Sequence, residues 1–156
     1  MTTSLQLRVA TQADFSLLAE VMYDAIWNGR SLYTFDQKRA WCPEVRSGSD
    51  WNERLMDQFV VLAETDRGVV GFMSLAHKGY IDFAYIRPPY QGTGLFRKLF
   101  ETLELRAIEV REARLWVHAS LMAQPAFTAM GFEIVKAENI EVRGQHLSRF
   151  EMQKAL

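Results

Sequence analysis

Apolar residues recur along the first third of the chain with two different spacings, and each spacing predicts one type of element. Strict alternation predicts a strand over residues 5–9. Apolar residues at helical spacing between residues 15 and 26 predict a helix that ends near the Asn-Gly pair at 28 and 29. The polar and aromatic stretch that follows predicts loops with two short helices, over 35–41 and 50–56.

From residue 58 onward, strand-like segments dominate. The elements expected there are strands over 59–64, 69–77 and 80–86, a helix over 96–110, a strand over 114–118, a helix over 121–130 and a closing hairpin over 132–142 and 146–152. Short turns between the first three of these strands favour antiparallel pairing. Because no repeat, low-complexity segment or linker interrupts the pattern, we predict one mixed α/β domain over residues 1–156.

The composition excludes several classes of protein. Eighteen Lys and Arg against nineteen Asp and Glu give a net charge of −1, which is too little positive charge for nonspecific nucleic-acid binding. No apolar stretch reaches the ~20 residues of a membrane helix, and no secretion signal opens the chain, so we expect a cytoplasmic protein without a membrane partner. Cys42 is the only cysteine and the three histidines are far apart, so we expect no disulfide and no metal site.

The segment 80–110 carries the strongest local signal for ligand binding. Two prolines end a strand, and the run Gln-Gly-Thr-Gly at 91–94 then opens a helix. A glycine-rich turn at a helix start leaves backbone N–H groups free and, with the helix dipole, suits phosphate. Leu95 and Phe96 stand where a Walker A loop needs Lys and Ser or Thr, and the third glycine of a dinucleotide fingerprint is absent. We therefore expect a phosphate-bearing ligand of another kind.

Three motifs resemble those of the GNAT superfamily of N-acetyltransferases. The run 91–96 resembles its acyl-CoA loop, with Gln91 and Gly94 at matching positions. The run 80–88 resembles the strand before that loop, and 126–132 resembles a segment near the C-terminus of the family. The order of elements agrees from end to end, and the chain is similar to a group of small bacterial acetyltransferases. The resemblance implies an α/β (α+β) fold whose mixed, mostly antiparallel sheet is flanked by helices, with two strands splayed at the acyl-CoA site.

The resemblance also implies how acetyl-CoA, the co-substrate, would bind. Its pyrophosphate would lie on backbone N–H groups of the loop, and its pantetheine arm would pair with the backbone where strands 80–86 and 114–118 splay apart. The residues implied for acyl-CoA binding are Ile86, Gln91, Gly92, Thr93, Gly94, Leu95, Phe96 and Phe127. Phe96 replaces the usual small residue, and we expect it to face the core. Phe127 replaces a Tyr that often protonates the CoA thiolate.

An acceptor amine with a pKa near ~10 must lose a proton before it attacks a thioester, so a base is required. Asp82 is the first candidate, because it lies mid-strand among apolar residues, where alternation places it on one face with Tyr80 and Ile86. A salt bridge to a nearby Arg or Lys is its alternative role. Tyr80 is a candidate to orient water or to act as the acid, and His118, at the end of a strand beside the splay, is the reserve base.

Five aromatic residues, three of them tryptophans, cluster between residues 27 and 51. The loop-rich segment that holds them contains Trp27, Tyr33, Phe35, Trp41 and Trp51. Residues in loops take part in ligand recognition more often than they belong to the core. Packing into the core is the alternative role of such side chains. We expect Trp27, Tyr33 and Trp41 to bind the acceptor, as walls suited to an apolar or aromatic amine or to an ammonium group.

The leading hypothesis is an acetyl-CoA-dependent enzyme that moves an acetyl group to the primary amine of a small molecule by direct attack on the thioester. The two phenylalanines that depart from the family pattern motivate an alternative, a catalytically weak or inactive acyl-CoA-binding regulatory module. A peptide or protein N-acetyltransferase is a third class, which would need an open groove. By family analogy alone, the closing hairpin is a possible homodimer contact.

Overall fold

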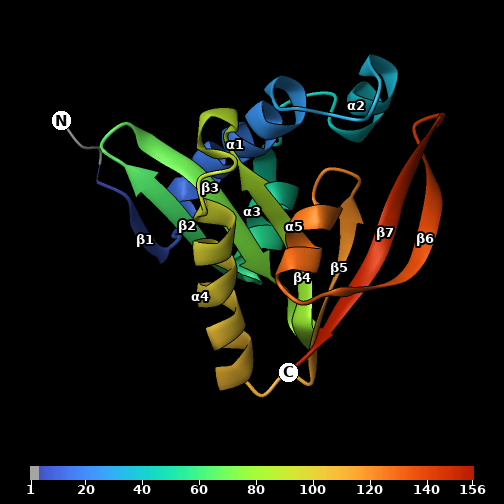
Figure 1. The fold of residues 1–156 in the computed structure, drawn as a ribbon. Coiled ribbons are helices and arrows are strands. Elements are labelled where there is room, and N and C mark those ends of the chain that lie inside the picture. Colours follow the sequence, from blue (N-terminus) through green and yellow to red (C-terminus); the bar gives the residue numbers. More distant parts are fainter. Residues whose placement is uncertain (1–3) are drawn as a thin grey trace.

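The computed structural model describes residues 4–156, so residues 1–3 of the predicted domain lie outside the described part. Its elements, labelled in Figure 1, are β1 (Gln6–Val9), α1 (Phe15–Asn28), α2 (Phe35–Trp41), α3 (Gly48–Met56), β2 (Phe59–Thr65), β3 (Gly68–Leu75), β4 (Tyr80–Ile86), α4 (Leu95–Glu109), β5 (Arg114–Ser120), α5 (Gln124–Ala129), β6 (Glu133–Val142) and β7 (Gln145–Ala155). The predicted order of elements is confirmed. Within residues 4–156, none of the helices has both the length and the apolar character needed to cross a membrane.

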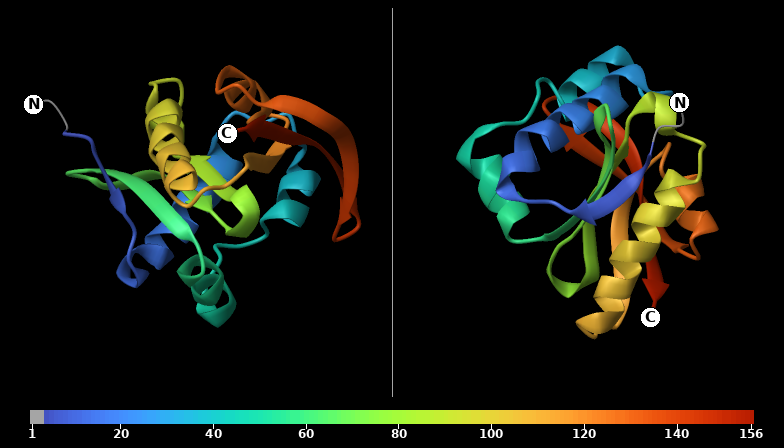
Figure 2. Two further views of the ribbon diagram at one scale, coloured as in Figure 1. Left: turned by 90° about the horizontal axis from the view of Figure 1, so that it is seen from below. Right: turned by 90° about the vertical axis from the view of Figure 1, so that its left-hand side faces the viewer.

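The seven strands form one sheet in the order β1-β2-β3-β4-β5-β7-β6. Within the described chain, β4 and β5 are the parallel neighbours, and the other neighbouring strands pair antiparallel. The long β6–β7 hairpin curves away from the rest of the sheet (Figures 1 and 2). The predicted fold class, a mixed and mostly antiparallel sheet flanked by helices, is confirmed.

Helices cover both faces of the sheet (Figure 2). On one face, the apolar side of α4 packs through Leu99 and Leu103, which are fully buried. On the other face, α1 and α3 pack through Leu18 and Trp51, and the indole N–H of Trp51 donates to the backbone carbonyl of Phe15 at 2.7 Å. Fully burying each such aliphatic side chain stabilises the fold by roughly 1.5–3 kcal/mol. The two layers hold β4 from both sides, which fixes the strand that borders the site.

The orientation of Asp82 differs from the prediction because β4 contains a bulge. Its pairing with β3 skips one residue, so Asp82 and Phe83 both face the α1–α3 layer. Ile86 packs instead in the core beneath α4. Strict alternation had placed Asp82 and Ile86 on one face, and the extra residue of a bulge shifts that alternation by one position.

The helix predicted over 121–130 is shorter in the structure. The strand β5 continues to Ser120, and α5 begins only at Gln124. The Ser120 hydroxyl accepts a hydrogen bond from the Ala123 N–H at 3.1 Å, so it stabilises a turn rather than capping the helix directly. Pro125 then lies in the first helical turn, where its missing N–H costs no hydrogen bond.

The parallel strands β4 and β5 separate along their length, as the resemblance implied. They pair at Tyr80 with Trp116 and at Ile81 with Val117, and the pairing ends there. Toward Ile86 and Ser120 the two strands diverge, so backbone groups on their facing edges lose their sheet partners. This opening in the middle of the sheet positions the site.

Candidate active site

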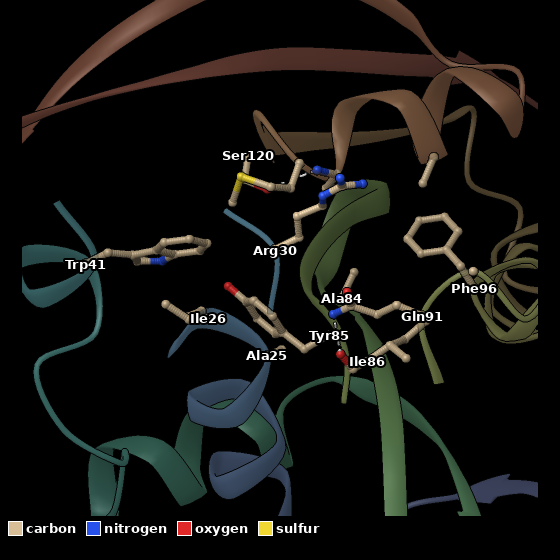
Figure 3. Close-up of a pocket in the computed structure, with 14 residues that line it drawn as sticks. Ala25, Ile26, Arg30, Trp41, Ala84, Tyr85, Ile86, Gln91, Phe96 and Ser120 are labelled. Atoms are coloured by element: carbon tan, nitrogen blue, oxygen red, sulfur yellow. Dashed lines mark hydrogen bonds between the residues drawn. The ribbon is translucent and has the colours of Figure 1, made fainter. Parts of the chain in front are cut away.

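The main cavity of the site lies in the opening between β4 and β5 (Figure 3). It has a volume of about 280 Å³ and takes its walls from α1, β4, the glycine loop and the β5–α5 turn. Its lining side chains include Arg30, Trp41, Tyr85, Ile86, Gln91 and Phe96. The cavity joins the loop that the sequence singled out to the splayed strands.

The glycine loop has the geometry of an anion cradle. Gly92 and Gly94 have φ values of 72° and 87°, a region that disfavours residues with a Cβ. A Cβ built on either glycine meets no atom within 4 Å, so open space lies in front of both. Gly94 caps the N-terminus of α4, and no backbone acceptor among residues 4–156 receives the N–H groups of Gly92, Thr93 or Gly94. These groups and the helix dipole can together bind a phosphate.

The other implied acyl-CoA residues have distinct places around this loop. The Gln91 side chain lines the cavity and donates to the Ile86 carbonyl at 2.8 Å, which ties the loop to the end of β4. The Thr93 hydroxyl donates to the Tyr90 carbonyl at 2.6 Å and closes the turn. Leu95 is buried in the core, so only its backbone is available to a ligand.

Phe96 and Phe127 form an aromatic pair beside the cavity. Their ring centroids lie 5.1 Å apart in an edge-to-face arrangement. Phe127 is fully buried, whereas Phe96 is half-buried and lines the main cavity as well as packing on the core. Phe96 therefore packs on the core, as expected, and also faces the main cavity. Neither ring offers a proton donor.

A smaller cavity of about 60 Å³, which we call the inner cavity, also lies between the two strands. Asp82 and Tyr85 of β4, His118 of β5, Trp41 of α2 and Phe127 of α5 all line it. Four of these five residues carry groups able to form hydrogen bonds. The three catalytic residues predicted from the sequence thus fall within or beside one small space.

Asp82 is held in an ion pair. Its carboxylate accepts two hydrogen bonds from Arg54 of α3, at 2.6 and 2.7 Å, and a third from the Gln58 amide at 2.7 Å. The Asp82 side chain is 7% exposed. Both carboxylate oxygens are already engaged by protein donors. The geometry therefore favours the salt-bridge role over that of general base.

His118 lies between Tyr80 and Glu151. Its Nδ1 lies 3.0 Å from the Tyr80 hydroxyl, and its Nε2 lies 3.8 Å from a Glu151 carboxylate oxygen. Burial lowers the pKa of His118, and the positive charge of Arg149 lowers it further. The imidazole is therefore neutral at neutral pH, the state in which it can accept a proton.

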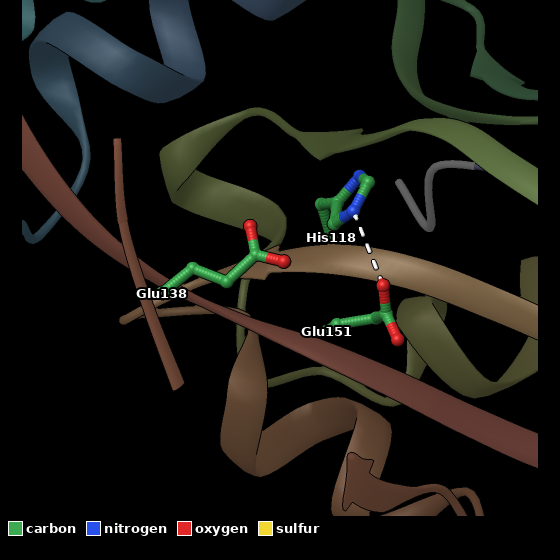
Figure 4. Close-up of side chains that lie close together, drawn as sticks. All are labelled: His118, Glu138 and Glu151. Atoms are coloured by element: carbon green, nitrogen blue, oxygen red, sulfur yellow. Dashed lines mark ion pairs between the residues drawn. The ribbon is translucent and has the colours of Figure 1, made fainter. Parts of the chain in front are cut away.

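His118, Glu138 and Glu151 lie close enough to resemble a metal-binding group (Figure 4). One ligand atom from each falls within 4.8 Å of the others. However, the Glu138 carboxylate already pairs with Arg149 at 3.0 Å and with Lys136 at 3.4 Å. Two cations on one carboxylate compete with a metal ion, so the arrangement fits an ion-pair network better than a metal centre.

The three aromatic residues predicted for the acceptor have different roles in the structure. Trp41 lines both cavities. Trp27 lines neither of them and donates its indole N–H to the Cys42 carbonyl at 2.8 Å. The buried Tyr33 hydroxyl donates to the Ser148 carbonyl at 2.6 Å and accepts from the Leu121 N–H at 3.2 Å. Because their polar groups serve backbone partners, Trp27 and Tyr33 support the fold around Trp41.

The comparisons with known proteins agree with this geometry. A family model described as the acetyltransferase (GNAT) domain matches residues 30–156. The chain belongs to the GNAT acetyltransferase family. It is 31% identical over 150 residues to the uncharacterized N-acetyltransferase YafP of Escherichia coli K12, covering 96% of this chain and 95% of that protein.

Solved structures give the same result for the fold. A GCN5-related N-acetyltransferase from Rhodopseudomonas palustris is 26% identical, with a TM-score of 0.87 over 100% of this chain and 99% of that one. The structure of yncA from Salmonella typhimurium with acetyl-CoA has a TM-score of 0.67 at 20% identity, covering 97% of this chain and 94% of that one. At that identity, the second comparison shows only that the two proteins share the GNAT fold.

Sequence reasoning missed Tyr85 and Arg30 in this GNAT site. The Tyr85 hydroxyl points into the main cavity (Figure 3) and has no hydrogen-bond partner among residues 4–156, while burial raises its pKa. Arg30 follows α1 and lines the same cavity. The signal for Tyr85 was its place within the family-like strand, whereas Arg30 stood in a loop whose path the sequence did not define.

Proposed function

We propose that the protein is an acetyl-CoA-dependent N-acetyltransferase whose acceptor is the primary amine of a small molecule. The observation that carries the proposal is the continuity of the opening between β4 and β5. It runs from the glycine loop, past the unpaired edges of the strands, to the inner cavity that His118 lines. Membership of the GNAT family and acetyl-CoA in the yncA structure support the same co-substrate.

The loop and the strand edge divide the binding of acetyl-CoA between them. Gly92, Thr93 and Gly94 would hold the pyrophosphate through their backbone N–H groups, while the edge of β4 near Ile86 would pair with the pantetheine arm. The open space in front of the two glycines leaves room for this group. When bound, acetyl-CoA supplies an activated acetyl carbon in the form of a thioester.

His118 is the base that the geometry favours. In the tautomer with its proton on Nδ1, that nitrogen donates to the Tyr80 oxygen, and Nε2 keeps its lone pair. Nε2 accepts the proton of the acceptor ammonium group, and the Glu151 carboxylate, 3.8 Å away, stabilises the resulting imidazolium. The amine nitrogen then forms a bond to the acetyl carbon, and the bond from that carbon to sulfur breaks. The second proton of the amine nitrogen passes to the departing thiolate or to solvent, which leaves the amide and free CoA.

The departing thiolate needs little help, because a thiol with a pKa near ~8.5 is a reasonable leaving group at neutral pH. The Tyr85 hydroxyl lines both cavities and has no protein partner among the described residues, so it is available to donate a hydrogen bond to developing negative charge. Burial raises the pKa of Tyr85, which keeps that donor protonated. Tyr85 and Phe127 line the same inner cavity. Tyr85 therefore offers a hydroxyl donor there, which Phe127 lacks.

Thiol release from acetyl-CoA in the presence of a panel of primary amines tests the proposal. We expect amine-dependent release of CoA together with mass-spectrometric detection of the N-acetylated product. Binding of acetyl-CoA without turnover on any amine would favour the regulatory module, and turnover only on peptides would favour the third class. The cytoplasmic location and the homodimer stay predictions, which cell fractionation and light scattering would check.

A further inference from the structure

A second polar cavity adjoins the inner cavity, and Trp41 lines both. It has a volume of about 260 Å³ and is lined by residues 41–47, by Asp50, Trp51 and Arg54 of α3, and by Arg143 of the β6–β7 turn. We call it the arginine cavity, because Arg46, Arg54 and Arg143 all line it. None of these three residues contacts a substrate in the proposed acetyl transfer.

The arginine cavity shares walls with the transfer site. Trp41 lines the arginine cavity, the main cavity and the inner cavity. Arg54 of the arginine cavity bonds to Asp82 of the inner cavity at 2.6 and 2.7 Å. The arginine cavity and the inner cavity that His118 lines are therefore neighbours.

The three arginines differ in whether the protein already uses their charge. Asp82 neutralises Arg54, and Arg143 donates to the Ala40 carbonyl at 2.6 Å, a bond that leaves its charge without a counterion. Arg46 is half-buried, and no residue among 4–156 forms an ion pair or a side-chain hydrogen bond with it. The Arg46 guanidinium is therefore free to pair with an anionic ligand in this cavity.

Two acidic residues, Glu44 and Asp50, also line the arginine cavity. Both are exposed, so water and salt screen them more than the half-buried Arg46. The arginines act on the buried floor of the cavity: burial raises the pKa of the Cys42 thiol, and the charges of Arg46 and Arg143 lower it. The inner part of the cavity is therefore electropositive.

We propose that the arginine cavity binds a carboxylate on the acceptor, so that the substrate is an amine whose carboxylate is several bonds away, such as an ω-amino acid. A planar guanidinium binds a carboxylate through two parallel hydrogen bonds, and Arg46 is free to do so. Trp41 separates this carboxylate from the reacting amine and packs against the atoms between them. The inference rests on the proposed function and narrows its acceptor to one chemical class.

The test compares ω-amino acids with their carboxamides, which keep the amine and the chain between the two groups but lose the negative charge. We expect kcat/KM to be about 10- to 100-fold higher for the acid of a preferred pair. Arg46→Gln should remove that preference by raising KM for the acid while leaving the carboxamide unchanged. Arg67→Gln, in the exposed β2–β3 turn, is the matched control and should keep the preference.

Calorimetry of the same amino acids and carboxamides with the CoA-loaded protein separates this inference from the proposed function. Arg46-dependent binding of an amino acid supports the carboxylate site even if no amine is acetylated, a result that would overturn only the proposed function. Equal use or binding of acid and carboxamide overturns the inference, as does a preference that survives Arg46→Gln. Stronger binding of an aminoalkylphosphonate than of the matching amino acid would overturn the assignment to a carboxylate.

Discussion

The glycine loop and the walls around Trp41 bind their proposed ligands by different physical means. The loop uses backbone N–H groups from consecutive residues, and its two glycines keep side chains out of the way. The walls around Trp41 use the side chains of Trp41, Tyr85 and Arg46, which come from α2, β4 and the loop after α2. A backbone site is encoded in one short run of sequence, whereas a side-chain site depends on segments that meet only in the fold.

The largest expected effect is at His118, which lines the inner cavity together with Trp41. Replacing it with Gln should lower kcat by roughly 10²- to 10⁴-fold, because the reaction loses its base. The lowered pKa of His118 means that wild-type activity should rise with pH through a value below ~6.5 and be constant above it, since the neutral imidazole is the active form. A pH–kcat profile of the Gln variant should lack this rise.

His146→Gln is the matched control for that experiment, because His146 is exposed beside the β6–β7 turn. It should keep the wild-type profile.

The lowered pKa of His118 also affects folding stability, since below ~6.5 the unfolded chain binds more protons than the folded one. Stability from this group is therefore present above the unfolded pKa and is lost as pH falls through the folded pKa. A pH-independent kcat in the wild type would remove His118 from the mechanism.

The next largest effect is expected in the glycine loop, which binds its proposed ligand through backbone N–H groups. Gly94→Trp places a large side chain in the open space before the loop and should weaken acetyl-CoA binding by about 100-fold, or ~2.7 kcal/mol. Gly144→Trp is a matched control, because Gly144 also has a positive φ, 83°, and open space around its Cβ position. Calorimetric titration with acetyl-CoA measures both. Equal affinities for the two variants would move the phosphate site away from the loop.

A smaller effect is expected when the ion pair between Asp82 and Arg54 is broken. Asp82→Asn leaves Arg54 without its counterion, and we expect the free energy of unfolding to fall by about 1–2 kcal/mol, since Arg54 is 48% exposed. Urea denaturation measures this loss, and the pH profile of kcat should keep its rise. A flat pH profile with unchanged stability would instead return Asp82 to the role of base.

The smallest effect concerns the support of Trp41. Tyr33→Phe removes the hydroxyl that joins Ser148 and Leu121, and should destabilise the fold by roughly 1 kcal/mol with little change in KM. Tyr23→Phe is the control, because the Tyr23 hydroxyl has no hydrogen-bond partner among residues 4–156. Thermal unfolding compares the two. A large rise in the KM of the acceptor without loss of stability would make Tyr33 a substrate contact.

Much of the fold was predictable because its signals are local. The order of elements, the bounds of α2 and β4, and the glycine loop follow from apolar spacing and turn residues. The orientation of Asp82 was not predictable by alternation, since a bulge depends on how β4 pairs with β3. The same limit applies to Tyr80 and His118, which lie 38 residues apart and meet only because β4 and β5 pair in parallel.

The sequence by itself determined the family, the order of elements and a glycine loop suited to phosphate, because each depends on neighbouring residues. Only the tertiary structure decided which polar groups act together. It paired Asp82 with Arg54, joined His118 to Tyr80 and Glu151, and left Arg46 without a partner among the described residues. Such contacts form between segments far apart in the chain, and their energies depend on distance and burial that appear only once the sheet and its two helical layers have assembled.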